Sequence, residues 1–258
     1  MATAQLGTSS KTIKQAVVER WFFTSMALAM IAITVAGFGP SIVNPAGRRG
    51  PISLLAAVHG TVFSVWLLLF LAQTLLIATD RVNWHKRLGM ASTFVLALML
   101  PLGYEATIAM TRRGFDLSGD QHVDLHPQVG QSLTLDALTA SVFNFCYLSA
   151  FAALTIAAIC YRQRPAIHKR LMLFANIELI GAPMAHLLGH ANLLTPATVM
   201  IPLVMFLFAA LVRDYLVERR IHPLTAVLAI ALFIAQPVEG VLIGPSPLWH
   251  HFVTWLIE

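Results

Sequence analysis

The sequence predicts an all-α integral membrane protein, a bundle of seven transmembrane helices. Its composition is 57% hydrophobic and 11% charged, with a mean hydropathy of +0.74. Soluble domains are usually about 45–50% apolar and about 25% charged. The chain is therefore too apolar for a disordered segment, a coiled coil, a nucleic-acid-binding domain or an ordinary soluble enzyme.

Seven apolar segments have the length needed to span a membrane. A helix of about 20 residues crosses the hydrocarbon core of a bilayer. The predicted spans are residues 21–43, 52–79, 88–110, 135–161, 171–188, 196–212 and 223–243. We therefore expect a single transmembrane domain over residues 1–258.

The flanks of the spans predict the remaining parts of this domain. Residues 1–20 are polar and predict a cytoplasmic N-terminal segment, and the seven spans fall within residues 21–243. Residues 245–258 contain Trp249 and Trp255 and predict a segment lying in the outer interface, where tryptophan is enriched.

The placement of basic residues predicts the orientation. With a cytoplasmic N-terminus, 13 of the 17 Lys and Arg residues fall on the cytoplasmic side, and the outer side holds those at 48–49 and 112–113. Cytoplasmic loops of membrane proteins carry such an excess. We expect a multi-pass protein of the bacterial inner membrane, surrounded by the lipid bilayer, with a periplasmic C-terminus. Basic residues placed in this way do not indicate a nucleic-acid partner.

A four-residue motif occurs twice. The run His-Lys-Arg-Leu at 85–88 recurs at 168–171, each time after an apolar span and a short basic loop. This recurrence predicts an internal parallel duplication of two helical hairpins, spans 2–3 and 4–5. We expect the basic residues to anchor the helices at the cytoplasmic leaflet and the histidines to cap a helix or bond a loop carbonyl. The alternative is that His85 and His168 bind a metal or haem on that side.

Ionisable residues inside spans are costly, so each marks a candidate functional position. The helical rise places Glu105 about 25 Å and His186 about 22 Å from the cytoplasmic ends of their spans. His59 and Glu239 also lie near the outer ends of theirs. Four groups from four spans are therefore expected to share the outer leaflet.

His186 and His190 are separated by about one helical turn, a spacing that lets two imidazoles bind one metal ion. His59 and Glu105 reach a similar depth and complete a predicted set of metal ligands. Imidazole with carboxylate suits zinc, iron or copper. The cofactor-binding histidines His59, His186 and His190 could instead supply axial ligands to a haem.

Two acids lie outside this set of ligands. Glu178 is expected to tune or protonate the site from below, and Glu239 to lie beyond it. Two alternatives stay open: the buried polar groups form a structural network between helices, or Glu178 and Glu239 line a proton or solute path. A further cluster, either metal-recruiting or a solvated acidic loop, consists of Asp120, His122, Asp124 and His126.

The leading functional hypothesis is a membrane protein that binds a metal or haem, for redox chemistry or for assembly of a membrane redox complex. The alternatives are a proton-coupled transporter using Glu105, Glu178 and Glu239, and a structural subunit of a membrane complex with no site of its own. No catalytic residue is assigned, because the sequence has no nucleophile elbow, Walker loop, dinucleotide fingerprint or HExxH motif. Whether the protein is an enzyme stays open.

A longer pattern of residues runs through spans 2 to 5. It comprises His59-Gly60, Trp66, Gln73-Thr74, the run 85–89, Arg164-Pro165 and the run 168–172. In this pattern the chain resembles a group of uncharacterised proteobacterial inner-membrane proteins with duplicated His-Lys-Arg-Leu motifs. The run 168–172 followed by His186 and His190 is also similar to small membrane proteins that assist the assembly of haem-copper oxidases. The second similarity implies haem or copper handling.

Overall fold

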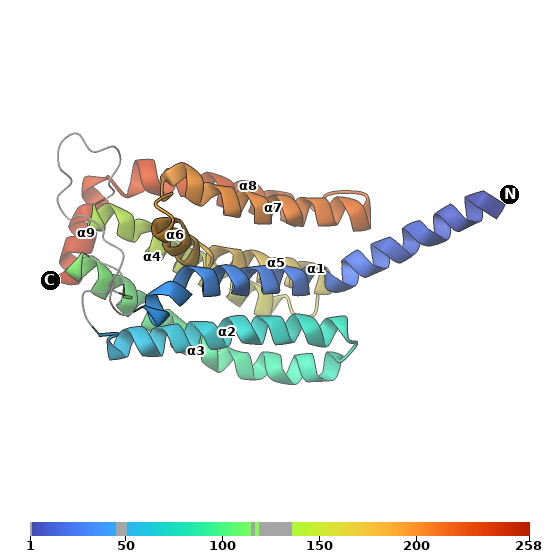
Figure 1. The fold of residues 1–258 in the computed structure, drawn as a ribbon, viewed down its shortest axis with the longest axis horizontal. Coiled ribbons are helices and arrows are strands. Elements are labelled where there is room, and N and C mark those ends of the chain that lie inside the picture. The colour runs from blue at the N-terminus through green and yellow to red at the C-terminus, as the bar shows by residue number, and fades with distance from the viewer. Residues whose placement is uncertain (1, 45–50, 115–116, 119–135) are drawn as a thin grey trace.

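The structure is a computed structural model that describes residues 2–44, 51–114, 117–118 and 136–258. Within these ranges the chain is all-helical, and seven helices are long and apolar enough to cross a membrane. The predicted fold class is therefore confirmed. Figure 1 shows the long helices running side by side, with the N- and C-terminal ends at opposite ends of the bundle. The predicted cluster at residues 120–126 lies outside the described residues.

Nine α-helices and one π-helix form the described part of the chain, and two of the seven spans are interrupted. The elements are α1 (Ala2–Val43), α2 (Leu54–Ala78), α3 (Val82–Arg113), α4 (Ala137–Cys160), α5 (Pro165–Glu178), α6 (Gly181–His190), α7 (Pro196–Glu218), α8 (Pro223–Val238), η2 (Glu239–Ile243) and α9 (Pro247–Ile257). Span five consists of α5 and α6, and span seven of α8 and η2.

Several helices extend beyond the predicted apolar limits. The helix α3 begins at Val82 and α5 at Pro165, so both copies of the repeated motif lie inside the first turns of helices. The predicted N-terminal segment 1–20 is helical from Ala2 as part of α1, which projects beyond the other helices (Figure 1). Hydropathy marks where a helix is buried in lipid, whereas backbone hydrogen bonding continues through lysine, arginine and glutamine, which are good helix formers.

Local sequence signals set the helix starts at one end of the bundle. Asp136 accepts a hydrogen bond from the Thr139 amide at 2.7 Å, and Ser53 and Ser246 cap α2 and α9 in the same way. Thr195 forms a capping box with the start of α7. Such caps satisfy amide groups that have no partner inside the helix, which matters most where a helix end leaves the hydrocarbon.

We call the end of the bundle with the connections 79–81, 161–164 and 219–222 the basic end, and the other end the far end. Near the far end, α9 packs against α3 and α4, and Figure 1 shows it lying across the long helices. This arrangement fits the predicted interfacial segment at residues 245–258. Which end faces the cytoplasm stays a prediction.

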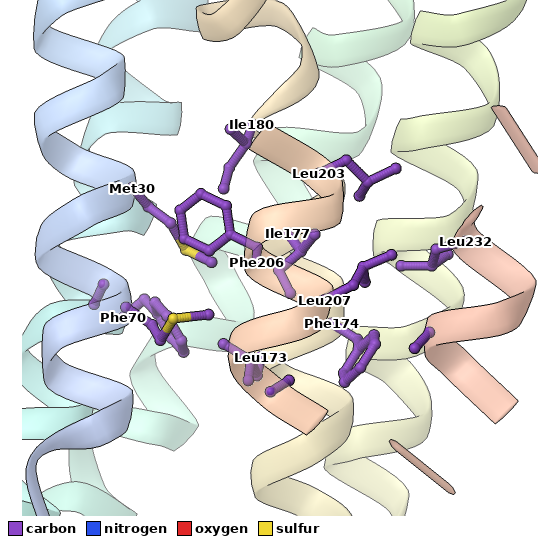
Figure 2. Close-up of a cluster of buried hydrophobic side chains, with 14 of the residues drawn as sticks. Met30, Phe70, Leu173, Phe174, Ile177, Ile180, Leu203, Phe206, Leu207 and Leu232 are labelled. Atoms are coloured by element: carbon purple, nitrogen blue, oxygen red, sulfur yellow. The ribbon is translucent and has the colours of Figure 1, made fainter. Parts of the chain in front are cut away.

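Span five is the central helix of the bundle. Within its most apolar window 61% of the residues are buried, against 33% or less in each of the other six spans. Figure 2 shows a cluster of apolar side chains in which Leu173, Phe174 and Ile177 of α5 meet side chains of α1, α2, α7 and α8. The other spans therefore present most of their surface to lipid, and span five presents most of its surface to protein.

A buried network of charged side chains connects α5, α7 and α8 near the basic end. Arg170 of α5 donates to Asp214 of α7 at 2.7 Å and to Thr225 of α8 at 2.9 Å. Arg213 donates to the same oxygen of Asp214 at 2.8 Å and, like Arg170, to Glu218. The side chains of Arg170, Arg213 and Asp214 are 3% exposed or less. The prediction that the arginine of the second motif is a surface anchor is therefore wrong, because acids from α7 draw it into the protein.

Candidate functional site

Span five breaks in the interior of the bundle, directly after Glu178. The amides of Leu179 and Ile180 turn back to carbonyls three residues earlier, and a new helix starts at Gly181. Pro183, in the first turn of α6, has no amide hydrogen for the carbonyl of Leu179. The proline thus explains why the helix is interrupted here and Glu178 ends α5.

Span seven is irregular next to its own acid. Pro237 lies near the end of α8, and Glu239 opens the π-helix η2, in which the Gly244 amide donates to the Glu239 carbonyl at 2.7 Å. A π-helical turn holds an extra residue and is energetically unfavourable, so it occurs mostly as a short bulge and often at functional sites. In a membrane, such a departure from regular helix is tolerated where protein surrounds it.

The two interruptions bring their acids together. Glu178 and Glu239 are 8% and 7% exposed, and the charge of Glu239 acts on the carboxyl of Glu178. From the basic end, the rise of each helix places Glu178 at about 20 Å and Glu239 at about 24 Å. The Cys146 thiol of α4 lies near the Glu239 carboxyl. We call Glu178 and Glu239 the acidic pair.

A cavity lies against Glu178 of the acidic pair. Its volume of about 10 Å³ is near the minimum that holds one water molecule. Glu178, Gln236 and Tyr147 of α4 contribute polar groups to its wall. The wall also includes Pro202, which lies inside α7. Spans five, six and seven therefore each carry a proline within their length near the site.

The chemistry of the acidic pair follows from its surroundings. Among the described residues, the charged group that acts on Glu178 is another acid, Glu239. Oε2 of Glu239 is buried without a hydrogen-bond partner within the described chain. Two buried carboxylates that act on each other in a medium of low dielectric disfavour each other's negative charge, which a shared proton or a bound cation relieves. The pair therefore suits a site that exchanges a proton or a small cation.

His186 and His190, the predicted histidine pair, differ in exposure and both lie beside α1. His186 is buried, with its ring 4.4 Å from that of Phe38 and 6.3 Å from that of His190. His190 is exposed, and its Nε2 lies 3.3 Å from Oγ of Ser41. Both residues pack against α1.

His59 and Glu105 lie elsewhere. His59 is stacked on Phe63 with ring centroids 4.1 Å apart, and its Nδ1 is buried without a hydrogen-bond partner among the described residues. Glu105 is exposed on α3. Within the described ranges no group of three or more His, Cys, Asp or Glu side chains is placed to hold a metal ion. The metal or haem site built on His59, Glu105, His186 and His190 stays a prediction.

The repeated histidines meet each other. The rings of His85 and His168 lie edge to face with centroids 6.2 Å apart, at the basic end. Nδ1 of His168 donates to the carbonyl of Ala158 at 2.8 Å. The expected bond to a carbonyl is therefore present, but the carbonyl belongs to helix α4 and not to a loop. A two-fold axis along the membrane normal that passed between these rings would produce this contact. The internal duplication itself stays a prediction.

The sequence named Glu178 and Glu239 together only in the alternative of a proton or solute path. Its leading grouping placed Glu239 by depth with His59, Glu105 and His186, whereas in the structure its charge acts on Glu178. The signal that could have indicated this pairing is the prolines: Pro183 follows Glu178 by five residues, and Pro237 precedes Glu239 by two. Mid-span prolines mark interrupted helices, and interrupted helices carry ion sites in transporters.

The fold and the site together define an integral membrane protein with seven spanning helices and a buried acidic pair. No protein-family model, no curated protein and no solved structure matches the chain. The functional argument therefore depends on the chemistry of this site.

Proposed function

We propose that the protein is a proton-coupled membrane transporter, in which Glu178 and Glu239 share an exchangeable proton. The observation that supports this most is the meeting of two buried acids at two helix interruptions, Glu178 at the end of α5 and Glu239 at the start of η2. A structural network would be expected to neutralise its acids with basic partners, as Asp214 is neutralised near the basic end.

Interrupted helices are the usual way in which transporters build ion sites in the middle of the membrane. Backbone groups freed at the break face the ion, and the half-helices can move relative to each other. Here the break lies in the central span, whose far half, α6, packs against α1 and α7. A rearrangement of α6 would open or close the site without unfolding the bundle.

The path from the acidic pair to the basic end is closed. The apolar cluster in Figure 2 shares Ile177, Ile180, Leu203 and Phe206 with the wall of the cavity. The charge network around Arg170 and Asp214 lies beyond it. A protein that exposed its acids to both sides at once would short-circuit the proton gradient, so one closed side is what the proposal requires.

Proton flux into liposomes tests the proposal. The purified protein is reconstituted with a pH-sensitive dye inside, and flux is started by a pH step with the membrane potential clamped by potassium and valinomycin. We expect slow flux above that of empty liposomes, carried as the protonated site alternates between the two sides, and its loss in Glu178→Gln and in Glu239→Gln. Glu105→Gln is the matched control, because it removes an acid from a span outside the pair and should keep the wild-type flux.

Two results would contradict the proposal. One is wild-type liposomes that are no more permeable to protons than empty ones. The other is equal flux in the wild type, Glu178→Gln and Glu239→Gln. Sodium or potassium salts added at constant pH distinguish the exchanged ion, since a site for a metal cation would show inhibition of proton flux by one of them.

The metal- or haem-binding function and a place in a larger redox complex stay predictions from the sequence, as does the role of a structural subunit. A visible spectrum and a metal analysis of the same purified sample test the first, with His186→Ala as the variant that should lose the bound group. We also propose the bacterial inner membrane, with a cytoplasmic basic end, as the location.

A further inference from the structure

A groove on the outside of the bundle is separate from the cavity at the acidic pair. It lies near the far end between α3, α4 and α9 and has a volume of about 440 Å³. Tyr104 and Phe145 stack with ring centroids 5.8 Å apart, and Trp249 meets Phe145 edge to face at 5.7 Å. Phe252 is 42% exposed, so the groove opens on the side of the protein that faces lipid.

The groove offers a hydrocarbon surface, because its polar atoms are already bonded within the protein. Nε1 of Trp249 donates to the carbonyl of Leu138 at 2.9 Å. Ser149 donates to the carbonyl of Phe145 at 2.7 Å, and the hydroxyl of Tyr104 lies 2.9 Å from that of Ser149. The part of a ligand that occupies this groove therefore has no polar partner to meet and must be apolar.

A cationic side chain, Arg112, follows the groove on α3 toward the far end of the bundle. Tyr104 and Ile108 line it from α3, and Arg112 follows one turn after Ile108 on the same helix face. Arg112 is exposed, and its Nε donates to the carbonyl of Ile257 at 2.8 Å. In the described part of the chain, its two terminal nitrogens make no recorded hydrogen bond.

We propose that this groove is a binding site for a membrane phospholipid, with an acyl chain against the aromatic wall and the phosphate on Arg112. The volume lies within the range of about 300–1,000 Å³ typical of ligand pockets. The guanidinium group binds phosphate through paired hydrogen bonds. An apolar stripe that ends in a cation at the level of α9 matches the order of chain and headgroup in a bilayer leaflet.

The site has a structural consequence for the acidic pair. Cys146 lines the groove, and its thiol also lies near the carboxyl of Glu239. A chain held in the groove covers the thiol on its lipid side and fixes α9 against α3 and α4. The proposal does not depend on the transport function, since a lipid can bind here whether or not the acids exchange protons.

Native mass spectrometry of the purified full chain tests the site, with palmitoyl-oleoyl phosphatidylglycerol or phosphatidylethanolamine as the added lipid and oleic acid as the phosphate-free probe. We expect one phospholipid to bind more tightly than oleic acid. Arg112→Gln should weaken phospholipid binding about tenfold or more, because a hydrogen bond to a charged group is lost. Arg87→Gln, an exposed arginine at the basic end, is the matched control and should bind as the wild type does.

A larger side chain that fills the groove provides a test that does not depend on Arg112. Ile108→Trp should abolish the bound phospholipid, and Phe252→Ser, on the partly exposed α9, should weaken it without touching the buried core. Wild-type binding in Arg112→Gln and in the groove variants would overturn the proposal.

Discussion

Arg170 and Arg87 show how one residue type acquires two roles. They hold the same position in the two copies of the His-Lys-Arg-Leu motif, yet Arg170 is buried against Asp214 and Glu218. Arg87 is exposed, with its guanidinium 5.5 Å from the Trp84 ring. The difference arises because acids of α7 lie beside the second copy. A buried charge is tolerated only when its hydrogen-bond partners are in place.

We expect Arg170→Gln to be strongly destabilising. The substitution leaves Asp214 buried with one cationic partner fewer, and breaking a buried ion pair costs about 3–5 kcal/mol. Arg87→Gln removes the same side chain from an exposed position and should cost within about 0.5 kcal/mol. Thermal unfolding of both variants in one detergent measures the difference. Similar melting temperatures would show that the network does not hold the helices together.

At the scale of the elements, the position of the acidic pair depends on where spans five and seven depart from regular α-helix. Glu178 lies ten residues after His168, and the residue ten positions after His85 in the first motif copy is Val95. The helix α3 passes through Pro101 without a break, whereas span five breaks before Pro183. The two hairpins thus share a motif at the basic end, and only the second carries an acid ten residues after the motif and an interruption within the described chain.

Glycine at the break is needed for close packing. A Cβ atom on Gly181 would overlap the ring of Tyr147, which lines the cavity, whereas a Cβ on Gly60 in α2 would meet nothing within 4 Å. We expect Gly181→Ala to destabilise the protein by about 1–3 kcal/mol through overpacking. Gly60→Ala should leave stability unchanged or raise it by up to about 1 kcal/mol, because alanine favours helix.

Melting temperatures and proton flux should report the same defect. Displacement of the Tyr147 ring should lower flux in Gly181→Ala, while Gly60→Ala should keep it. Equal stability of the two variants would indicate that the Tyr147 ring moves freely and that the cavity wall is not rigid.

At the scale of the whole molecule, the bundle has a polar asymmetry that fits one orientation. The charge network and the exposed Arg87 lie near the basic end, and the interfacial helix α9 lies at the far end. The excess of lysine and arginine predicts that the basic end is cytoplasmic. The proposed lipid site would then face the outer leaflet.

Cysteine labelling measures this orientation. Asn83 and Leu193 are exposed at the basic and far ends, respectively. Cys160 is also exposed, at the end of α4 at the basic end, so the test uses a Cys160→Ser background. A membrane-impermeant maleimide applied to spheroplasts should label Leu193→Cys directly and Asn83→Cys only after lysis. The Cys160→Ser protein without an added cysteine should stay unlabelled. Direct labelling of Asn83→Cys with protection of Leu193→Cys would reverse the orientation.

The sequence by itself determined the fold class and the seven spans. Those properties depend on the transfer of each segment from water to lipid, a free energy that adds up along a short window and needs no knowledge of neighbours. The same reasoning correctly marked Glu178 and Glu239 as unusual, because an acid in a span is costly wherever it lies.

Only the tertiary structure decided which of these groups meet. Depth along a helix grouped Glu239 with His59 and Glu105, but contact also depends on how each helix is rotated and where it breaks. Rotation places Glu105 on the exposed side of α3, and the interruptions at Leu179 and in η2 bring Glu178 to Glu239. Helix rotation results from side chains on several spans packing at once, so no single segment of sequence contains it.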